Sequence, residues 1–161
     1  MIPTLEWTDA GVRFLDQTKL PMEETYVLAK DYRAVAEVIR TMIVRGAPAI
    51  GVSAAMGVAL GLLRSPATDM KQLDKELNNI CEILAKTRPT AVNLFWGIER
   101  IRQLVHTMSR KPGVTVTQIQ QEAVAEANRM YDEDIAACRE MGAHGAALLP
   151  TAGGVLTHCN A

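Results

Sequence analysis

Apolar and polar residues alternate over three short stretches within the first 30 residues. Residues 5–7, 12–15 and 25–28 each mix β-branched, aromatic and other apolar side chains, which is the composition typical of strands. Residues 8–11 have the composition of a hairpin turn, and the Leu20-Pro21 step interrupts the chain again. The pattern predicts a small antiparallel sheet at the start of the chain.

From residue 35 the apolar spacing changes to that of one helix face. The stripe consists of Val35, Val38, Ile39, Met42 and Ile43. It stops at Arg45-Gly46, and glycine is common just past the end of a helix. Pro48 then suits the first turn of a new helix, where its missing N–H has no bond to make. The sequence therefore predicts one helix that ends before Gly46 and a second that begins beside Pro48.

The stretch from residue 47 to residue 63 contains no charged side chain. Its 17 residues reach the lower limit of a membrane-spanning helix, which is about 17–25 residues. Its glycines, Gly51, Gly57 and Gly61, each cost about 1 kcal/mol of helix propensity relative to alanine. They are tolerable where another backbone packs closely against the helix. We therefore predict a buried helix at the centre of a bundle, and no membrane span.

Three further helices are predicted, beginning near Asp69, after Pro89 and near Thr117. Asp69 with Gln72, and Thr117 with Gln120, have the spacing of a capping box. Gly142 is expected to end the last helix. The inward faces are, in order, Leu73, Leu77, Ile80 and Leu84; Leu94, Phe95, Ile98, Ile101, Leu104, Val105 and Met108; and Ile119, Ala123, Met130 and Ala137.

The last segment has a different character. Residues 151–154 read as a loop, and residues 155–159 again have strand composition. A strand that is buried on both faces needs neighbours in a sheet, and no later residues supply them. We therefore expect a first domain over residues 1–150, and the start of a second domain over residues 151–161, as the front portion of a longer protein.

Composition and charge narrow the class of protein. The 161 residues include 17 Lys and Arg against 18 Asp and Glu, so the formal net charge is −1. This balance argues against a dedicated nucleic-acid binder, which usually carries a basic surplus. Cys81, Cys138 and Cys159 form no close-spaced pair, so neither a disulfide framework nor a structural zinc site is indicated. A reducing, cytoplasmic setting is expected, with Cys81 and Cys138 as packing residues inside helices.

Two loops between the predicted helices carry candidate chemistry. Arg45-Gly46-Ala47-Pro48 places a cation beside a helix N-terminus, a combination that suits a phosphate or a polyhydroxylated ligand. The alternative is an ordinary turn with a solvated arginine. Thr87-Arg88-Pro89-Thr90 repeats the arrangement more weakly. The spacing alone does not bring the two loops to one pocket.

Cys159 lies near the carboxyl end of the last predicted strand, where ligands bind in open α/β sheets. A thiol there is a candidate catalytic group, although buried cysteine is also common as a small hydrophobe. His158 is its neighbour, but strand alternation points the two side chains to opposite faces, against a paired dyad. The sequence contains no phosphate loop, dinucleotide fingerprint or metal-ligand cluster.

Four segments, in this order, resemble the methylthioribose-1-phosphate isomerases of methionine salvage. They are FLDQ at 14–17, MIVRGAPAIG at 42–51, TRPTAVNL at 87–94 and LTHCNA at 156–161. The wider family includes ribose-1,5-bisphosphate isomerases and the regulatory subunits of translation initiation factor 2B. These two remain as alternatives, and the presence of Cys159 with Arg45, Gly46 and Ala47 favours an enzyme over a regulatory subunit.

The resemblance implies a fold and an activity. The fold would be α+β, mostly α, with a small antiparallel sheet and a helical bundle followed by a Rossmann-like domain. The protein would be a homodimer that isomerises 5-methylthioribose 1-phosphate to 5-methylthioribulose 1-phosphate, with no metal, organic cofactor, nucleic acid or membrane involved. By the same resemblance, Arg45, Gly46, Ala47 and Arg88 bind the substrate and Cys159 is catalytic. The family's catalytic aspartate lies in the later domain, so residues 1–161 alone would be inactive.

Overall fold

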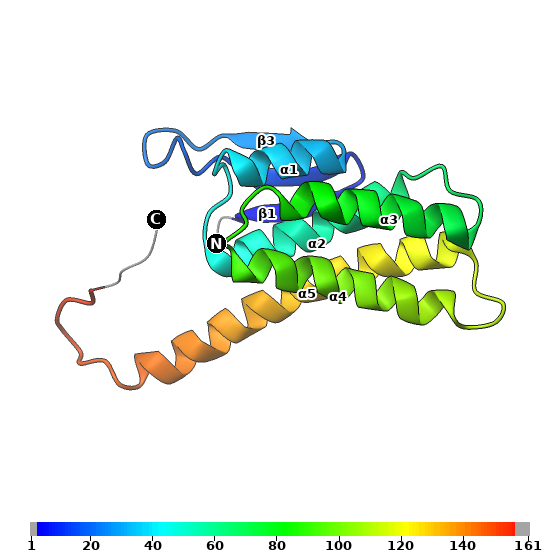
Figure 1. The fold of residues 1–161 in the computed structure, drawn as a ribbon. Helices are drawn as coiled ribbons and strands as arrows, with labels where there is room; N and C mark the ends of the chain where they lie inside the picture. Colours follow the sequence, from blue (N-terminus) through cyan, green and yellow to red (C-terminus); the bar gives the residue numbers. More distant parts are fainter. Residues whose placement is uncertain (1–2, 157–161) are drawn as a thin grey trace.

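The computed structural model describes residues 3–156 (Figure 1). Three strands near the start, β1 (Leu5–Thr8), β2 (Gly11–Leu15) and β3 (Tyr26–Ala29), pair in chain order as an antiparallel sheet. The register sets Phe14 opposite Leu5 on one side and opposite Val27 on the other. Leu5, Val12 and Phe14 are buried against the helices. The predicted antiparallel sheet is confirmed.

Five helices follow within the described residues, and α2 lies at their centre (Figure 1). The helices are α1 (Tyr32–Arg40), α2 (Ala47–Leu63), α3 (Met70–Ala85), α4 (Val92–Ser109) and α5 (Val116–Ala146). α2 packs against each of the other four helices and against β1 and β2. Almost all of its residues are buried, which confirms the predicted central helix. Within the described residues, no helix combines the length and hydrophobicity that crossing a membrane requires.

The closest helix packing joins α2 to α4 near the start of both helices. A Cβ atom added to Gly51 would lie 2.8 Å from the carbonyl oxygen of Asn93, and one added to Gly97 would overlap the carbonyl oxygen of Gly51. Only residues without a side chain allow two backbones to come this close. The contact holds the N-terminal ends of α2 and α4 beside each other.

α1 ends at Arg40, earlier than the stripe up to Ile43 predicted. Met42 takes a positive φ of 60°. The N–H of Ile43 donates to the carbonyl of Val38, and the N–H of Met42 donates to the carbonyl of Ile39. These two bonds form a Schellman motif, the usual way to satisfy the last carbonyls of a helix. The helix therefore stops at a methionine in the left-handed conformation, and not at Gly46.

α5 differs from its prediction at both ends. Its capping box uses Thr115 and Gln118, two residues before the predicted pair, because Gln120 instead donates to the carbonyl of Leu62 at 2.8 Å. The helix also continues through Gly142 to Ala146. One glycine costs only about 1 kcal/mol, too little to stop a helix among good helix formers.

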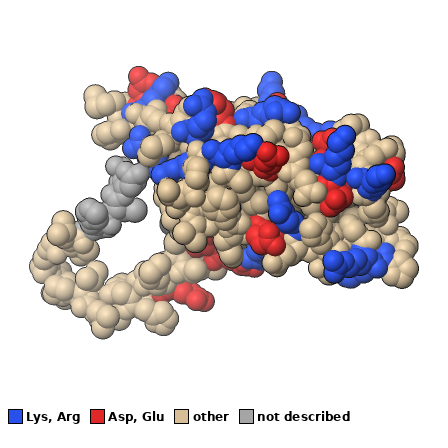
Figure 2. All heavy atoms as spheres, viewed as in Figure 1, with Lys and Arg blue, Asp and Glu red and all other residues tan. Residues whose placement is uncertain are grey.

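The second half of α5 projects beyond the helical body (Figure 1). Ala137 and Cys138 are therefore exposed, and their predicted packing roles are wrong, whereas Cys81 is buried as expected. Phe95 on α4 was predicted to face inward, but the residue is 42% exposed. In Figure 2, acidic and basic side chains mix over the helical body, while few charged side chains lie on the projecting end.

The last described residues do not form a strand. Val155 and Leu156 are exposed and have no pairing partner within residues 3–156. The rest of the expected strand, including His158 and Cys159, lies outside the described residues.

Candidate functional site

Two of the five helices begin without a side-chain cap. Gly46 precedes α2 and Ala91 precedes α4, and neither side chain can accept a hydrogen bond. The other three helices begin at Asp31, Asp69 and Thr115, whose side chains accept hydrogen bonds from backbone N–H groups of the first turn. In these first turns, Pro48 has no N–H group and the N–H of Leu94 donates to the carbonyl of Ala91 at 3.0 Å. The remaining first-turn N–H groups of α2 and α4 are available to a ligand, and the helix dipole adds partial positive charge there.

The two uncapped ends face one cavity of about 390 Å³, which we call the α2–α4 cavity. Its lining combines the start of α2 with the loop that leads into α4: Gly46, Ala47, Ile50, Arg88, Thr90, Ala91, Val92 and Asn93. The structure thus brings together Gly46, Ala47 and Arg88, which the sequence placed in two separate loops. Such a cavity offers free N–H donors, two helix dipoles and a guanidinium, which together suit an anion.

Gly46 adopts a φ of 90°. This conformation is open to glycine and strained for residues with a Cβ atom. A Cβ atom added at Gly46 would meet nothing within 4 Å. The requirement for glycine therefore comes from the backbone conformation and not from lack of space.

The two arginines of the candidate site have different surroundings. Arg88 is half-buried in the cavity wall, and none of the ion pairs formed among residues 3–156 involves it. Arg45 is not part of the lining; its Nε donates to the carbonyl of Met42 at 3.1 Å, so it braces the turn that ends α1. Its predicted contact with a ligand stays a prediction.

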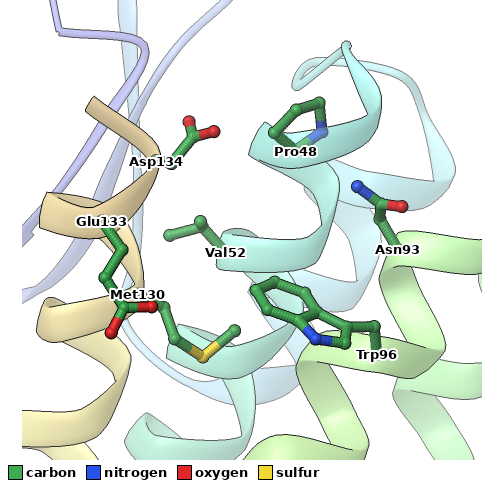
Figure 3. Close-up of a pocket in the computed structure, with 7 residues that line it drawn as sticks. All are labelled: Pro48, Val52, Asn93, Trp96, Met130, Glu133 and Asp134. Atoms are coloured by element: carbon green, nitrogen blue, oxygen red, sulfur yellow. The ribbon is translucent and has the colours of Figure 1, made fainter. Parts of the chain in front are cut away.

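A second cavity of about 440 Å³ lies between α2, α4 and α5, and we call it the α5 cavity (Figure 3). Asn93 lines both cavities. The other residues around the α5 cavity are Pro48, Val52, Trp96, Met130, Glu133 and Asp134. In Figure 3, Asp134 extends from α5 toward the first turn of α2 at Pro48.

The two carboxylates of the α5 cavity are in opposite situations. Glu133 accepts hydrogen bonds from Arg100 at 2.5 and 2.8 Å, and these bonds lower the pKa of its carboxyl. Asp134 forms no hydrogen bond or ion pair with another residue in the range 3–156, and burial raises the pKa of its carboxyl. Asp134 is therefore the carboxylate whose charge the described residues leave uncompensated.

Sequence reasoning gave no role to Asn93, Glu133 or Asp134. A signal for Asp134 was present, because it follows Met130 by four residues on the inward stripe of α5. A carboxylate at an inward position is unusual and points to a special site. Cys159 lies outside the described residues. Among residues 3–156, no three His, Cys, Asp or Glu side chains come together as metal ligands.

The fold is a sheet-plus-bundle domain with a cavity at two uncapped helix starts. The signature of the initiation factor 2 subunit family matches residues 43–161. The chain therefore belongs to the initiation factor 2 subunit family.

Within that family, similar curated proteins include methylthioribose-1-phosphate isomerases. The methylthioribose-1-phosphate isomerase of Koribacter versatilis is 52% identical over 161 residues, which is 100% of this chain and 45% of the relative. That of Trichlorobacter lovleyi is 50% identical over 159 residues, 98% of this chain and 45% of the relative. The chain thus spans less than half the length of these relatives. The resemblance seen in the four sequence segments is confirmed.

Two solved structures share the fold. The 5-methylthioribose 1-phosphate isomerase from Pyrococcus horikoshii OT3 matches with a TM-score of 0.87 and 39% identity, over 93% of this chain and 41% of that protein. The delta subunit of translation initiation factor eIF-2B from A. fulgidus matches with a TM-score of 0.81 and 35% identity, over 92% and 42%. The α+β, mostly α architecture predicted from the sequence is confirmed.

Proposed function

We propose that this chain is the substrate-binding front portion of a methylthioribose-1-phosphate isomerase of methionine salvage. The intact enzyme converts 5-methylthioribose 1-phosphate to 5-methylthioribulose 1-phosphate. The observation that carries the proposal is the convergence of two uncapped helix starts and Arg88 on the α2–α4 cavity. The two relatives at 50% and 52% identity support the choice of reaction.

The phosphate of the substrate would bind in the α2–α4 cavity. First-turn N–H groups of α2 and α4 donate to its oxygens, and Arg88 adds charge-assisted hydrogen bonds. Gly46 and Ala47 form the edge of the α2 start on which the phosphate rests. Arg45 stands just before that edge and would reach the substrate from the turn that it braces.

The reaction moves hydrogen from C2 to C1 of the sugar. Because the phosphate on C1 locks the sugar as a glycosyl phosphate, the ring must open during the reaction. Proton transfer through an enolate-like intermediate and direct hydride shift both meet this requirement. In either route the cationic cavity stabilises negative charge that develops near the phosphate. Cys159 would transfer a proton or stabilise that charge, opposite an aspartate from the later domain.

The division of labour follows the expected domains. Residues 1–150 would hold the phosphate, and a Rossmann-like domain that begins at residues 151–161 would complete the site. We propose a cytoplasmic homodimer as the working form. Residues 1–161 alone would have no activity, because they would hold the substrate from one side only and little of the orienting effect could develop.

The alternative is a non-enzymatic regulatory subunit, which the likeness to the A. fulgidus protein favours. The identity to that protein is 35%, against 52% to the isomerase of Koribacter versatilis. An isomerase therefore fits the relatives better.

Turnover by the intact protein decides between the two. We expect the intact protein to convert 5-methylthioribose 1-phosphate, and Cys159→Ser to remove most of the turnover while leaving the folded fraction unchanged. Cys138→Ser is the matched control, because Cys138 is exposed on α5. An intact, folded protein with no turnover would contradict the enzyme assignment, and equal turnover in the two variants would contradict the role of Cys159.

A further inference from the structure

The α5 cavity has the opposite chemistry from the α2–α4 cavity beside it. One wall is apolar and consists of Val52, Trp96 and Met130 (Figure 3). The charged residues of its lining, Glu133 and Asp134, are both acids. The α2–α4 cavity contains an arginine and two helix starts but no acid in its lining. A ligand that reached both cavities would meet positive potential at one end and an apolar, negative site at the other.

The cation beside Trp96 does not neutralise the α5 cavity. Arg100 lies beside the ring of Trp96, with its guanidinium carbon 5.8 Å from the ring centroid. Its nitrogens already donate to Glu126 at 2.5 Å and to Glu133. The positive charge of Arg100 is thus already paired with two carboxylates. Asp134 remains, extended from α5 toward Pro48 in the first turn of α2.

Position links the two cavities. Asn93 lines both of them, and Ala47 of one cavity is followed directly by Pro48 of the other. The cavities therefore flank the start of α2, and a sugar phosphate anchored in the α2–α4 cavity would present its far end to the α5 cavity. This step, and the one that follows, rests on the proposed function.

We propose that the α5 cavity selects the substituent on C5 of the sugar, and that Asp134 excludes sugars with a second phosphate. The apolar wall accepts an uncharged substituent such as methylthio. A phosphate at the same place would bring two negative charges next to an uncompensated carboxylate, and juxtaposed like charges weaken binding. The selection works by rejecting the wrong substrate as well as by fitting the right one.

The test compares two substrates in the intact protein, 5-methylthioribose 1-phosphate and ribose 1,5-bisphosphate. Asp134→Asn keeps the shape of the side chain and removes its charge. We expect the ratio of the two kcat/KM values to shift by about tenfold toward the bisphosphate, mainly through a rise in the value for the bisphosphate. Asp132→Asn is the matched control, because Asp132 is exposed on the same helix and lines neither cavity.

A second variant guards against a local folding defect. Asp134→Ser removes the same charge with a smaller side chain, and it should shift the ratio in the same direction. Trp96→Ala removes part of the apolar wall, and Trp96 is half exposed, so the fold should tolerate the change. This variant should lower kcat/KM for the methylthio substrate more than for the bisphosphate.

The outcomes separate this inference from the proposed function. If the wild-type protein converts the methylthio substrate and the ratio stays the same in both Asp134 variants, the selection role is overturned while the proposed function stands. Equal losses for both substrates would also overturn it, because Asp134 would then serve a shared step. If the wild-type protein converts neither substrate, the proposed function fails, and this inference fails with it.

Discussion

The five helix starts divide into two groups with different surroundings. α1, α3 and α5 begin at Asp31, Asp69 and Thr115, with side-chain caps at 2.8–3.2 Å. α2 and α4 begin at Gly46 and Ala91, without such caps. Only the uncapped starts line the α2–α4 cavity. The capped starts stabilise the fold, whereas the uncapped ones keep their donors available for an anion.

The difference has an energetic meaning. A side-chain cap contributes about 1 kcal/mol to the stability of a helix or protein. α2 and α4 forgo that contribution, and their own packing compensates for it, since α2 is buried over most of its length. Departures from local rules of this kind are expected where a protein binds its ligand.

Arg88→Ala should have the largest effect, because it removes the cation of the α2–α4 cavity. Charge-assisted hydrogen bonds contribute about 1.5–3 kcal/mol each, so the loss of two of them lowers kcat/KM at least about 100-fold. Steady-state kinetics on the intact protein measure this, with Arg110→Ala as control at the far, exposed end of α4. An Arg88→Ala protein with unchanged kcat/KM would rule out the anion site.

Gly97→Ala should separate the two uncapped helix starts. The new methyl group would overlap the backbone of Gly51, so α4 must move away from α2. Overpacking of this kind costs about 3 kcal/mol of unfolding free energy, and activity should fall with it. Chemical denaturation measures the loss. Gly113→Ala is a milder control, because that glycine has open space around it, although its φ of 79° adds some strain. A Gly97→Ala protein as stable as the wild type would contradict the close contact.

Ala91→Asp should turn an uncapped start into a capped one. The new carboxylate would accept from the first-turn N–H groups of α4 and raise the unfolding free energy by about 1 kcal/mol. The same carboxylate would occupy donors in the α2–α4 cavity and repel an anion, so phosphate binding should weaken by about 10-fold or more. Thermal unfolding and titration with inorganic phosphate measure the two effects. Stronger phosphate binding would contradict the assignment.

Asp69→Ala is the reverse experiment on a capped helix. Loss of the cap on α3 should lower the unfolding free energy by about 1 kcal/mol, with kcat and KM unchanged once the folded fraction is equal. Asp69 is exposed and its start lies away from both cavities. A change in KM without a change in stability would contradict the distinction between capped and uncapped helix starts.

The smallest effect concerns the ion pairs that join α5 to α4. Burial opposes ionisation of Glu126, but hydrogen bonds from Arg129 and Arg100 outweigh it and lower the pKa of its carboxyl below the ordinary value. Stability from a lowered carboxyl pKa is present above the unfolded pKa and is lost as the pH falls through the folded one. Glu126→Gln should therefore lose less stability than the wild type between about pH 5 and pH 3, by about 1 kcal/mol. Thermal unfolding across this range measures the difference, and parallel pH profiles would contradict it.

Local patterns were sufficient where one local rule decided the outcome. The side chain of Asp69 caps α3, as its spacing predicted. The side chain of Gln72 accepts from the N–H of Thr68, however, and not from the N–H of Asp69. Where two residue pairs could form the same capping box, the local pattern did not identify the right one. Thr115 with Gln118 and Thr117 with Gln120 have the same spacing. The first pair forms the box, and the side chain of Gln120 instead bonds to the end of α2.

The antiparallel sheet, the buried central helix and the two loops with candidate arginines could be predicted from the sequence, because composition and periodicity along one segment are enough for each. Three arrangements became visible only in the folded chain: Gly46 and Arg88 share a cavity, Arg45 turns back to Met42, and Asp134 lies beside the same helix start. The physical reason is that these arrangements depend on the close contact of Gly51 with Gly97 and on the packing of α5 against α2. Such contacts join segments far apart in the chain, and no local pattern records them.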